Sequence, residues 1–590
     1  MSLYHRSFRL ALSIVSLFAV AGSSGEEVVV SPKLRLAAQT AALENWKDAR
    51  FGMFVHWGVY AVPAGVYNGV VIPHIGEWIM YDAQIPKAEY KNFAKDFAPQ
   101  GYDAATWVDL ARQAGMKYMV VTAKHHDGFA LFDSKVSDWD AVDATPGHRD
   151  LLMPIVEECR KQRMPLGFHY SQALDWWHPG GGQFDQPWDE TQRGSLDTYL
   201  EKVSLPQIKE LIANYGPVAS FFFDTPVGMN PMRAAAIQAV LSPSTLINDR
   251  LYQGSPGSFL SYEGNLPATP DRERPWELCL SINDTWGFKS SDQNWKSSAW
   301  LLKILVDSAS RGGNVLLNVG PDADGRIPEP AANVLLQIGA WMSKNGESIH
   351  DTRRSPFPTI PWNGGCTVRS LSSGNTELYV HLYDQSSGGD LRLAGLSNEV
   401  ISARLLPNGP DIKTTLQGNS QVLKLPQLAK DVISVVKVMV KGKPVIEVAA
   451  TEPDKSGKIN LQAGSAVLTG RCLRLERQQD SPESNLGYWT EMGDYAEWII
   501  NLPIASQYNC IWNIACDAGS VGAVIAIKIA DGAELGRFEI PSTGGWKTFR
   551  SVKGALLSLP SGLTKLRLVP IAKPGLGVVN LRSMTLEKIR

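Results

Sequence analysis

Polar side chains recur where short apolar segments of this 590-residue chain end. The clearest case is Asp224, which directly follows three consecutive Phe residues. Burial of a carboxylate is costly unless partners compensate it, so a catalytic role would explain this position. The alternative is an Asp that accepts backbone hydrogen bonds at a strand end or caps the next helix.

Histidine shows the same placement, since four of the ten His residues stand at the ends of such segments: His56, His125, His126 and His169. If these segments share one barrel, the imidazoles converge on one pocket. They would then bind a metal ion, or they would bind sugar hydroxyls together with Trp57 or Trp78. Adjacent His125 and His126 should point to opposite faces of a strand, and the Asp and Glu positions complete no metal motif. We therefore predict no metal.

The segments that position these residues are typical of the buried parallel strands of a (β/α)8-like barrel, an α/β fold. Such strands are apolar throughout, and barrel enzymes carry their chemistry where the strands end. Helical periodicity lies between them, for example at 104–115, 150–163 and 199–215. We expect the eighth strand within 66–85 and the catalytic domain over 35–350. The seven evident strands lie within 50–58, 117–129, 165–171, 219–224, 245–250, 277–282 and 314–321.

The pattern changes after residue 350. Short alternating runs separated by Gly, Ser, Asn and Pro predict a β-sandwich domain over 351–450. A polar linker near 451–457 precedes more short strands over 458–590, which favour a β jelly-roll resembling a carbohydrate-binding module. The alternative is a spacer without a ligand; a structural calcium ion is also open.

Residues 1–21 have the basic start, the apolar run and the small-residue site of a signal peptide, so we expect a secreted or periplasmic protein. No other stretch approaches the ~20 apolar residues of a membrane span. Acidic and basic residues are interspersed at a net charge of −2, which argues against nucleic acid as a partner. Cys510 and Cys516 are close enough in sequence for a possible disulfide.

Seven motifs in order resemble bacterial α-L-fucosidases of glycoside hydrolase family 29: FGMFVHWG (51–58), GEW (76–78), AKHHDGF (123–129), HYS (169–171), WELC (276–279), TWGF (285–288) and RGGNVLLNVGP (311–321). The resemblance implies a retaining mechanism without metal or organic cofactor. Two carboxyl groups about 5–5.5 Å apart perform it, one as nucleophile and one as acid/base. Asp224 matches the nucleophile, although Thr225 and Pro226 follow it where many relatives have Gly.

The resemblance leaves the acid/base open among three residues. Glu263 lies in a loop like the one that supplies this carboxyl group in bacterial relatives, and a loop position suits a group that must reach the leaving oxygen. Glu277 belongs to the better-defined WELC motif, where the alternative is a structural partner of a barrel Arg. Glu273 lies between them.

The expected function is hydrolysis of terminal α-linked L-fucose from fucosylated oligosaccharides or glycoconjugates, through a covalent intermediate. Phe222 or Trp286 is expected to provide an apolar wall for the fucose methyl group. Alternatives are a glycosidase for a similar sugar such as a galactoside, a non-catalytic carbohydrate-binding protein, and a metal-dependent hydrolase. The sequence does not predict the oligomeric state. The expected substrate-binding residues are His56, Trp57, Glu77, Trp78, His125, His126, His169, Tyr170, Arg250 and Trp286.

Overall fold

A computed structural model describes residues 32–589 except 183, 268–269, 359, 361, 384–387, 430–432, 448–449, 471, 478–483 and 531. The predicted signal peptide lies outside these residues. The chain forms two compact units. The first contains the described residues up to Asn265 together with Glu273–Asp351, and the second contains Leu266–Arg272 and Thr352–Arg590. Among the described residues, no helix is long and apolar enough to cross a membrane.

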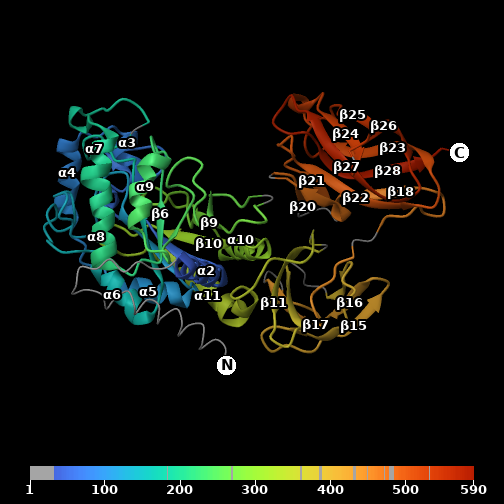
Figure 1. Ribbon diagram of the computed structural model, residues 1–590, viewed down its shortest axis with the longest axis horizontal. Coiled ribbons are helices and arrows are strands. Elements are labelled where there is room, and N and C mark those ends of the chain that lie inside the picture. The colour runs from blue at the N-terminus through green and yellow to red at the C-terminus, as the bar shows by residue number, and fades with distance from the viewer. Residues whose placement is uncertain are drawn as a thin grey trace. The chain divides into compact units, whose positions relative to one another are not determined.

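The first unit is built on eight parallel strands in the order β7-β6-β5-β4-β1-β10-β9-β8 (Figure 1). The first and last of these meet, because Asn248 and Phe259 form a parallel bridge and Ser258 N donates to Ile247 O at 2.6 Å. The strands are β1 (Phe51–Val55), β4 (Met119–Lys124), β5 (Leu166–Tyr170), β6 (Ser220–Phe223), β7 (Leu246–Ile247), β8 (Leu260–Glu263), β9 (Trp276–Ser281) and β10 (Asn314–Val319).

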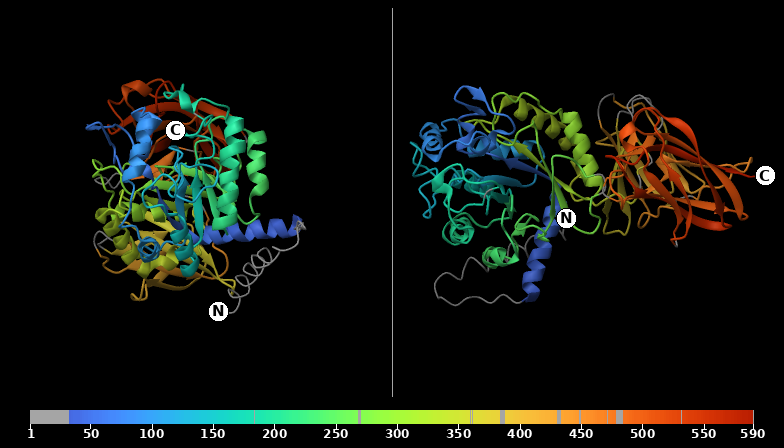
Figure 2. Two further views of the ribbon diagram at one scale, coloured as in Figure 1. Left: turned by 90° about the vertical axis from the view of Figure 1, so that its left-hand side faces the viewer. Right: turned by 90° about the horizontal axis from the view of Figure 1, so that it is seen from above.

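Helices lie outside these strands, as Figure 2 shows from two further directions. Asp103 caps α5 by accepting a hydrogen bond from Ala105 N, and apolar residues of α5 such as Trp107 are buried. The helices are α2 (Pro32–Ala49), α3 (Ile79–Asp82), α4 (Lys87–Asp96), α5 (Ala104–Gln113), α6 (Met153–Gln162), α7 (Leu196–Tyr199), the π-helical turn η4 (Leu200–Ser204), α8 (Leu205–Tyr215), α9 (Pro231–Val240), α10 (Ser298–Ser310) and α11 (Glu329–Asn345).

The expected position of the eighth strand is wrong. Residues 66–85 contain a small hairpin, β2 (Val66–Tyr67) with β3 (Val70–Val71), followed by the short helices η2 (Gly76–Trp78) and α3. The eighth barrel strand is β8, which pairs with β9 in parallel. It is short and only partly buried, so it lacks the continuous apolar run that marks the other strands.

The second unit holds two groups of antiparallel sheets. In the first, β11-β12-β17-β14 and β13-β16-β15 enclose a core that includes Val380, Leu393, Leu423 and Val438. Its strands are β11 (Gly364–Ser370), β12 (Thr376–Leu382), β13 (Gly389–Leu393), β14 (Val400–Leu405), β15 (Thr414–Gln417), β16 (Ser420–Leu425) and β17 (Ser434–Val440).

The second group pairs β20-β21-β28-β23-β26, joined by β18, with β19-β22-β27-β24-β25 around a core containing Trp498 and Trp512. The barrel followed by sandwiches confirms the predicted fold class. Cys510 and Cys516 are both free. The strands are β18 (Ile459–Gln462), β19 (Val467–Thr469), β20 (Arg474–Arg477), β21 (Ser484–Gly487), β22 (Tyr495–Leu502), β23 (Ser506–Ala515), β24 (Val524–Ile529), β25 (Glu534–Glu539), β26 (Arg550–Leu559), β27 (Gly562–Ala572) and β28 (Asn580–Lys588).

Candidate active site

A pocket with a cavity volume of about 130 Å³ lies where the barrel strands end. Because all eight strands are parallel, residues that end or follow different strands reach the same end of the barrel. The pocket is lined by Phe54, His56, Ile75, Glu77, Trp78, His125, His126, His169, Phe222, Asp224, Thr225, Arg250, Glu263, Cys279 and Trp286.

Asp224 follows β6 and points its carboxylate into this pocket. Its Oδ2 lies 3.4 Å from His169 Nε2 and 3.5 Å from His126 Nε2, and its Oδ1 accepts from Arg250 Nη1 at 3.0 Å. Burial alone would raise the pKa of Asp224, but hydrogen bonds from the two imidazoles and the charge of Arg250 hold that pKa well below its ordinary value. The carboxylate is therefore ionised and suited to nucleophilic attack.

Glu263, the last residue of β8, shares this cation. Its Oε2 lies 2.7 Å from Arg250 Nη2, and its side chain is 45% exposed. Arg250 follows β7, so one guanidinium connects the ends of β6, β7 and β8. Glu263 thus stands at the open side of the pocket while Asp224 lies deeper, which is the arrangement expected of an acid/base and a nucleophile.

A buried glutamine also connects the segments that follow β6 and β7. Gln172, which is fully buried, accepts from Asp224 N at 3.1 Å and donates to Arg250 O at 2.8 Å. The backbone positions of the candidate nucleophile and of its cation are therefore set by one side chain from the loop after β5. Gln172 was not among the predicted site residues, although it directly follows the HYS motif.

An amide fixes the tautomer of His56. Asn318 of β10 donates through Nδ2 to Trp286 O at 2.7 Å, so its Oδ1 is left to accept from His56 Nδ1 at 2.7 Å. In the neutral ring, Nε2 is then an acceptor. Burial lowers the pKa of His56 well below its usual value, with further lowering by His169. Asn318 lies in a predicted strand but was not among the predicted site residues.

Glu77 lines the pocket and anchors the loop that carries Trp286. Its Oε2 accepts from Gly287 N at 2.7 Å and from Thr285 Oγ1 at 3.2 Å, which fixes the loop that carries Trp286. Burial raises the pKa of Glu77 to about 7, although these hydrogen bonds oppose the increase.

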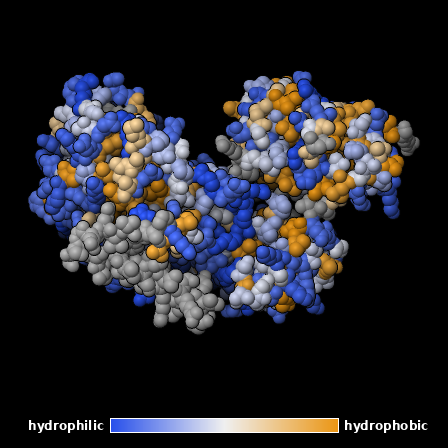
Figure 3. Space-filling model, viewed as in Figure 1, coloured by the Kyte–Doolittle hydropathy of each residue, from blue (hydrophilic) through white to orange (hydrophobic). Residues whose placement is uncertain are grey.

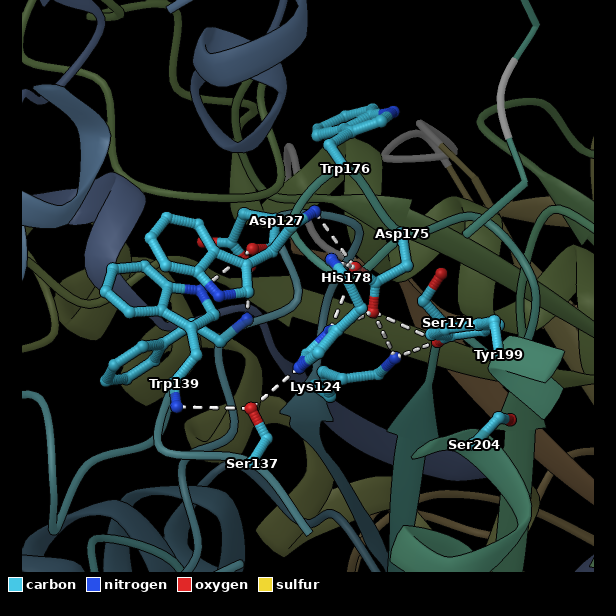
Figure 4. Close-up of polar contacts among 12 residues, drawn as sticks. Lys124, Asp127, Ser137, Trp139, Ser171, Asp175, Trp176, His178, Tyr199 and Ser204 are labelled. Atoms are coloured by element: carbon cyan, nitrogen blue, oxygen red, sulfur yellow. Dashed lines mark hydrogen bonds and ion pairs between the residues drawn. The ribbon is translucent and has the colours of Figure 1, made fainter. Parts of the chain in front are cut away.

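A buried ion pair supports the histidine side of the pocket (Figure 4). Lys124 Nζ, at the end of β4, lies 2.7 Å from Asp175 Oδ2, and both side chains are fully buried. Asp175 also accepts from Tyr199 Oη at 3.0 Å and from His178 N at 2.8 Å. The pair ties the strand that leads to His125 to the loop after β5.

The comparisons with known proteins agree with this geometry. The family model described as Alpha-L-fucosidase matches residues 24–347, more than half of the chain. This chain belongs to the α-L-fucosidase family. A second model, a carbohydrate-binding module of family 6, matches residues 470–588.

Three relatives illustrate how far the likeness to fucosidases extends. The α-L-fucosidase from Vibrio sp. strain EJY3 is 25% identical with a TM-score of 0.74, covering 94% of this chain and 99% of its own. A GH29 α-L-fucosidase from Bacteroides thetaiotaomicron, solved as a trapped covalent intermediate with 2-fluoro-fucosyl fluoride, is 26% identical with a TM-score of 0.61, covering 71% and 99%. The plasma α-L-fucosidase of Pongo abelii is 31% identical, covering 65% and 87%.

Three residues predicted for the site of this fucosidase-family chain lie elsewhere. Trp57 points away from the barrel interior and donates to Asp322 O at 2.8 Å, and Tyr170 donates to Gln207 Oε1 of α8 at 2.8 Å. Each directly follows a pocket histidine, and side chains alternate along a strand, so each faces outward. This orientation corrects the prediction that Trp57 and Tyr170 contact the sugar.

The third is Glu277, which lies near the amino-terminal end of β9, about 13 Å along the strand from its carboxyl end. It is buried against Tyr118, whose hydroxyl donates to it, and burial raises the pKa of Glu277 to about 7. Its partner is thus Tyr118 and not the Arg expected for a structural role. Glu273 is exposed and does not line the pocket.

His125 and His126 both line the pocket, where substrate-binding residues were expected, but they do not point to opposite faces of a strand. The expected alternation does not apply, because β4 ends at Lys124 and the chain turns through His125 and Gly128, where φ is +74°. Two groups of side chains place potential metal-ligand atoms within 4.8 Å of one another: His56, His125 and His169, and His125, His126 and Asp224. In the second group, the adjacent guanidinium of Arg250 opposes a further cation on Asp224.

Proposed function

We propose that this chain hydrolyses terminal α-linked L-fucose with retention, using Asp224 as nucleophile and Glu263 as acid/base. The observation that carries the proposal is the single guanidinium of Arg250, which contacts both carboxylates of one pocket. The covalent intermediate trapped in the Bacteroides relative supports a mechanism of this type.

In the first step, Asp224 attacks the anomeric carbon while Glu263 gives its proton to the leaving oxygen. The glycosidic bond breaks, and a fucosyl ester forms on Asp224. In the second step, Glu263 takes a proton from water, the oxygen of that water attacks the same carbon, and Asp224 leaves as a carboxylate. Two inversions give net retention, and Glu263 regains the proton that it lost.

The rest of the pocket recognises the sugar. His56 offers Nε2 as an acceptor toward the cavity, as its bond to Asn318 requires. Phe222 and Trp286 both line the cavity and provide apolar surface for the methyl group of fucose. A galactoside would place a hydroxymethyl group there, so fucosides should be the better substrates.

Hydrolysis of an aryl α-L-fucoside by the wild type, Asp224→Ala, Glu263→Ala and Glu277→Ala, each with and without azide, tests this proposal. Azide replaces the water that a missing general base would activate, and an aryl leaving group needs little protonation. We expect azide to rescue Glu263→Ala alone and Asp224→Ala to stay inactive. In Glu277→Ala, we expect any loss of activity to come from a smaller folded fraction, which azide does not change. Rescue of Glu277→Ala in place of Glu263→Ala would overturn the assignment.

The same assay separates the alternatives. Turnover of galactosides but not fucosides would favour the related glycosidase, and binding without turnover would favour a carbohydrate-binding protein. Full activity after dialysis against a chelator is expected, because no step above uses a metal ion.

The C-terminal module is proposed to bind glycan, which its family match supports. Tyr488 is a candidate contact, since this aromatic residue is 52% exposed on a loop after β21. Tyr488→Ala in the full chain should weaken retention on immobilised glycan without changing hydrolysis of the aryl fucoside. Unchanged retention would remove Tyr488 from this role.

A further inference from the structure

An aromatic surface continues outward from the sugar pocket. Trp78 lines the pocket, whereas Phe184 lies beyond it, with ring centroids 6.0 Å apart and planes inclined by 21°. Phe184 is 53% exposed. On the face of the first unit that Figure 3 shows, hydrophilic residues predominate and hydrophobic ones occur in small groups. An exposed ring stacked on a pocket residue is therefore a candidate for ligand contact.

The loop that carries Phe184 is held by hydrogen bonds, one before this ring, where Gly182 N donates to Ala173 O at 2.7 Å, and three after it. Tyr81 Oη donates to Asp185 Oδ2 at 2.5 Å, Trp188 Nε1 donates to Ile85 O at 3.1 Å, and Asp189 Oδ2 accepts from Lys87 N at 3.0 Å. Phe184 is thus presented to solvent by a held loop, so a ligand that stacks on it loses little entropy in ordering the loop.

The surface begins beside the reacting centre. The ring of Trp78 lies 5.6 Å from that of His126, and His126 contacts Asp224. On the other side, a Cβ at Gly182 would lie 3.2 Å from Val227 O, in the same turn as the pocket residue Thr225. Gly182, two residues before Phe184, thus packs beside the turn that follows the nucleophile, and Phe184 itself packs on Trp78 at the rim of the pocket.

We propose that Trp78 and Phe184 form the platform that binds the leaving group, a pyranose ring attached through the anomeric oxygen of fucose. This inference rests on the proposed function. A pyranose has an apolar face of C–H groups that stacks well on aromatic rings. The predicted preference is for fucosylated oligosaccharides over fucosides with a small leaving group.

The test compares wild type and Phe184→Ala on two substrates: α-L-fucosyl fluoride, which has no leaving sugar, and a fucosylated oligosaccharide. We expect kcat/KM to fall about tenfold on the oligosaccharide and to stay within about twofold on the fluoride. Phe184→Trp, which keeps an aromatic ring, should have a kcat/KM on the oligosaccharide close to that of the wild type. Met232→Ala, which removes an 85% exposed side chain of α9, is the matched control and should change neither.

Equal losses on both substrates would overturn the inference, because Phe184 would then support the pocket itself. Unchanged activity on both would overturn it as well, since no leaving group would use the ring. A wild-type protein that cleaves the fluoride but not the oligosaccharide would leave the proposed function standing and contradict the leaving-group platform. A wild-type protein that cleaves neither would overturn both.

Discussion

Asp224 and Glu263 bind opposite nitrogens of one guanidinium: Arg250 Nη1 lies 3.0 Å from Asp224 Oδ1, and Arg250 Nη2 lies 2.7 Å from Glu263 Oε2. One cation therefore orients both carboxylates and favours the ionised form of the nucleophile.

Arg250→Gln should move the acidic limb of the pH profile of kcat/KM to higher pH. The carboxylate of Asp224 must be ionised to attack, and Arg250 is one of the groups that hold its pKa low. Without the cation that pKa rises, so activity is lost sooner as pH falls. We also expect kcat/KM at the optimum to fall at least about a hundredfold. Arg250→Lys, which keeps the charge, should shift the limb less, and an unchanged limb in both variants would contradict this role.

Glu277→Gln should keep activity within about threefold and flatten the pH dependence of stability. The pKa of Glu277 is raised to about 7 by burial, so its contribution to stability is full below the unfolded pKa of about 4.3 and is lost as pH rises through about 7. The contribution removed is roughly 4 kcal/mol. Calorimetry between about pH 4 and about pH 8 measures it. Glu263→Gln should show the reverse, with activity lost and the pH dependence of stability retained.

Asn318→Ala should lower kcat/KM about tenfold or more, because His56 loses the partner that fixes its tautomer and the loop of Trp286 loses a hydrogen bond. Asn314 is the matched control. It is also a buried Asn of β10, but it lies at the opposite end of the strand and donates to Trp46 O. Asn314→Ala should cost comparable stability with little loss of kcat/KM, and equal kinetic losses would refute the assignment.

Thr225→Gly should raise the free energy of unfolding by about 1 kcal/mol and lower kcat several-fold. Thr225 is β-branched with φ of +47°, and a strained residue of this kind costs more than the entropy that Gly adds to the unfolded chain. Its N–H donates to Asp224 Oδ1 at 2.9 Å, which a more mobile residue would align less well. Arg163→Gly, at φ of +56° after α6, should gain stability without a kinetic effect.

The sequence predicted the strand-end pocket well because parallel strands bring their carboxyl ends together whatever their order. Asp224, Arg250 and the four histidines lie in the pocket for that reason. The errors have definite physical causes. Trp57 and Tyr170 are each one residue beyond a pocket histidine and point outward. Glu277 begins the strand that the sequence predicts over 277–282, so it lies at the end opposite the pocket, and only its WELC motif made it a candidate.

The eighth strand was missed for another reason. β8 has no continuous apolar run, its apolar–polar alternation covers only four residues, and all four stay partly or fully exposed even though β8 pairs with β9. Gln172 and Asn318 were missed because their roles arise only when three segments far apart in the sequence come together.

The bridge between Asn248 and Phe259 is the narrowest joint of the barrel, since β7 has two residues and β8 has four. Arg250 and Glu263 stand just past this joint on its two sides, and their ion pair crosses it. Local opening of the barrel between β7 and β8 would separate Glu263, the proton donor, from Arg250. A transition-state analogue that binds both carboxylates should therefore hold β7 and β8 together. It should slow amide hydrogen exchange at 258–263 more than in β1 and β4, which lie farthest from this junction in the strand order.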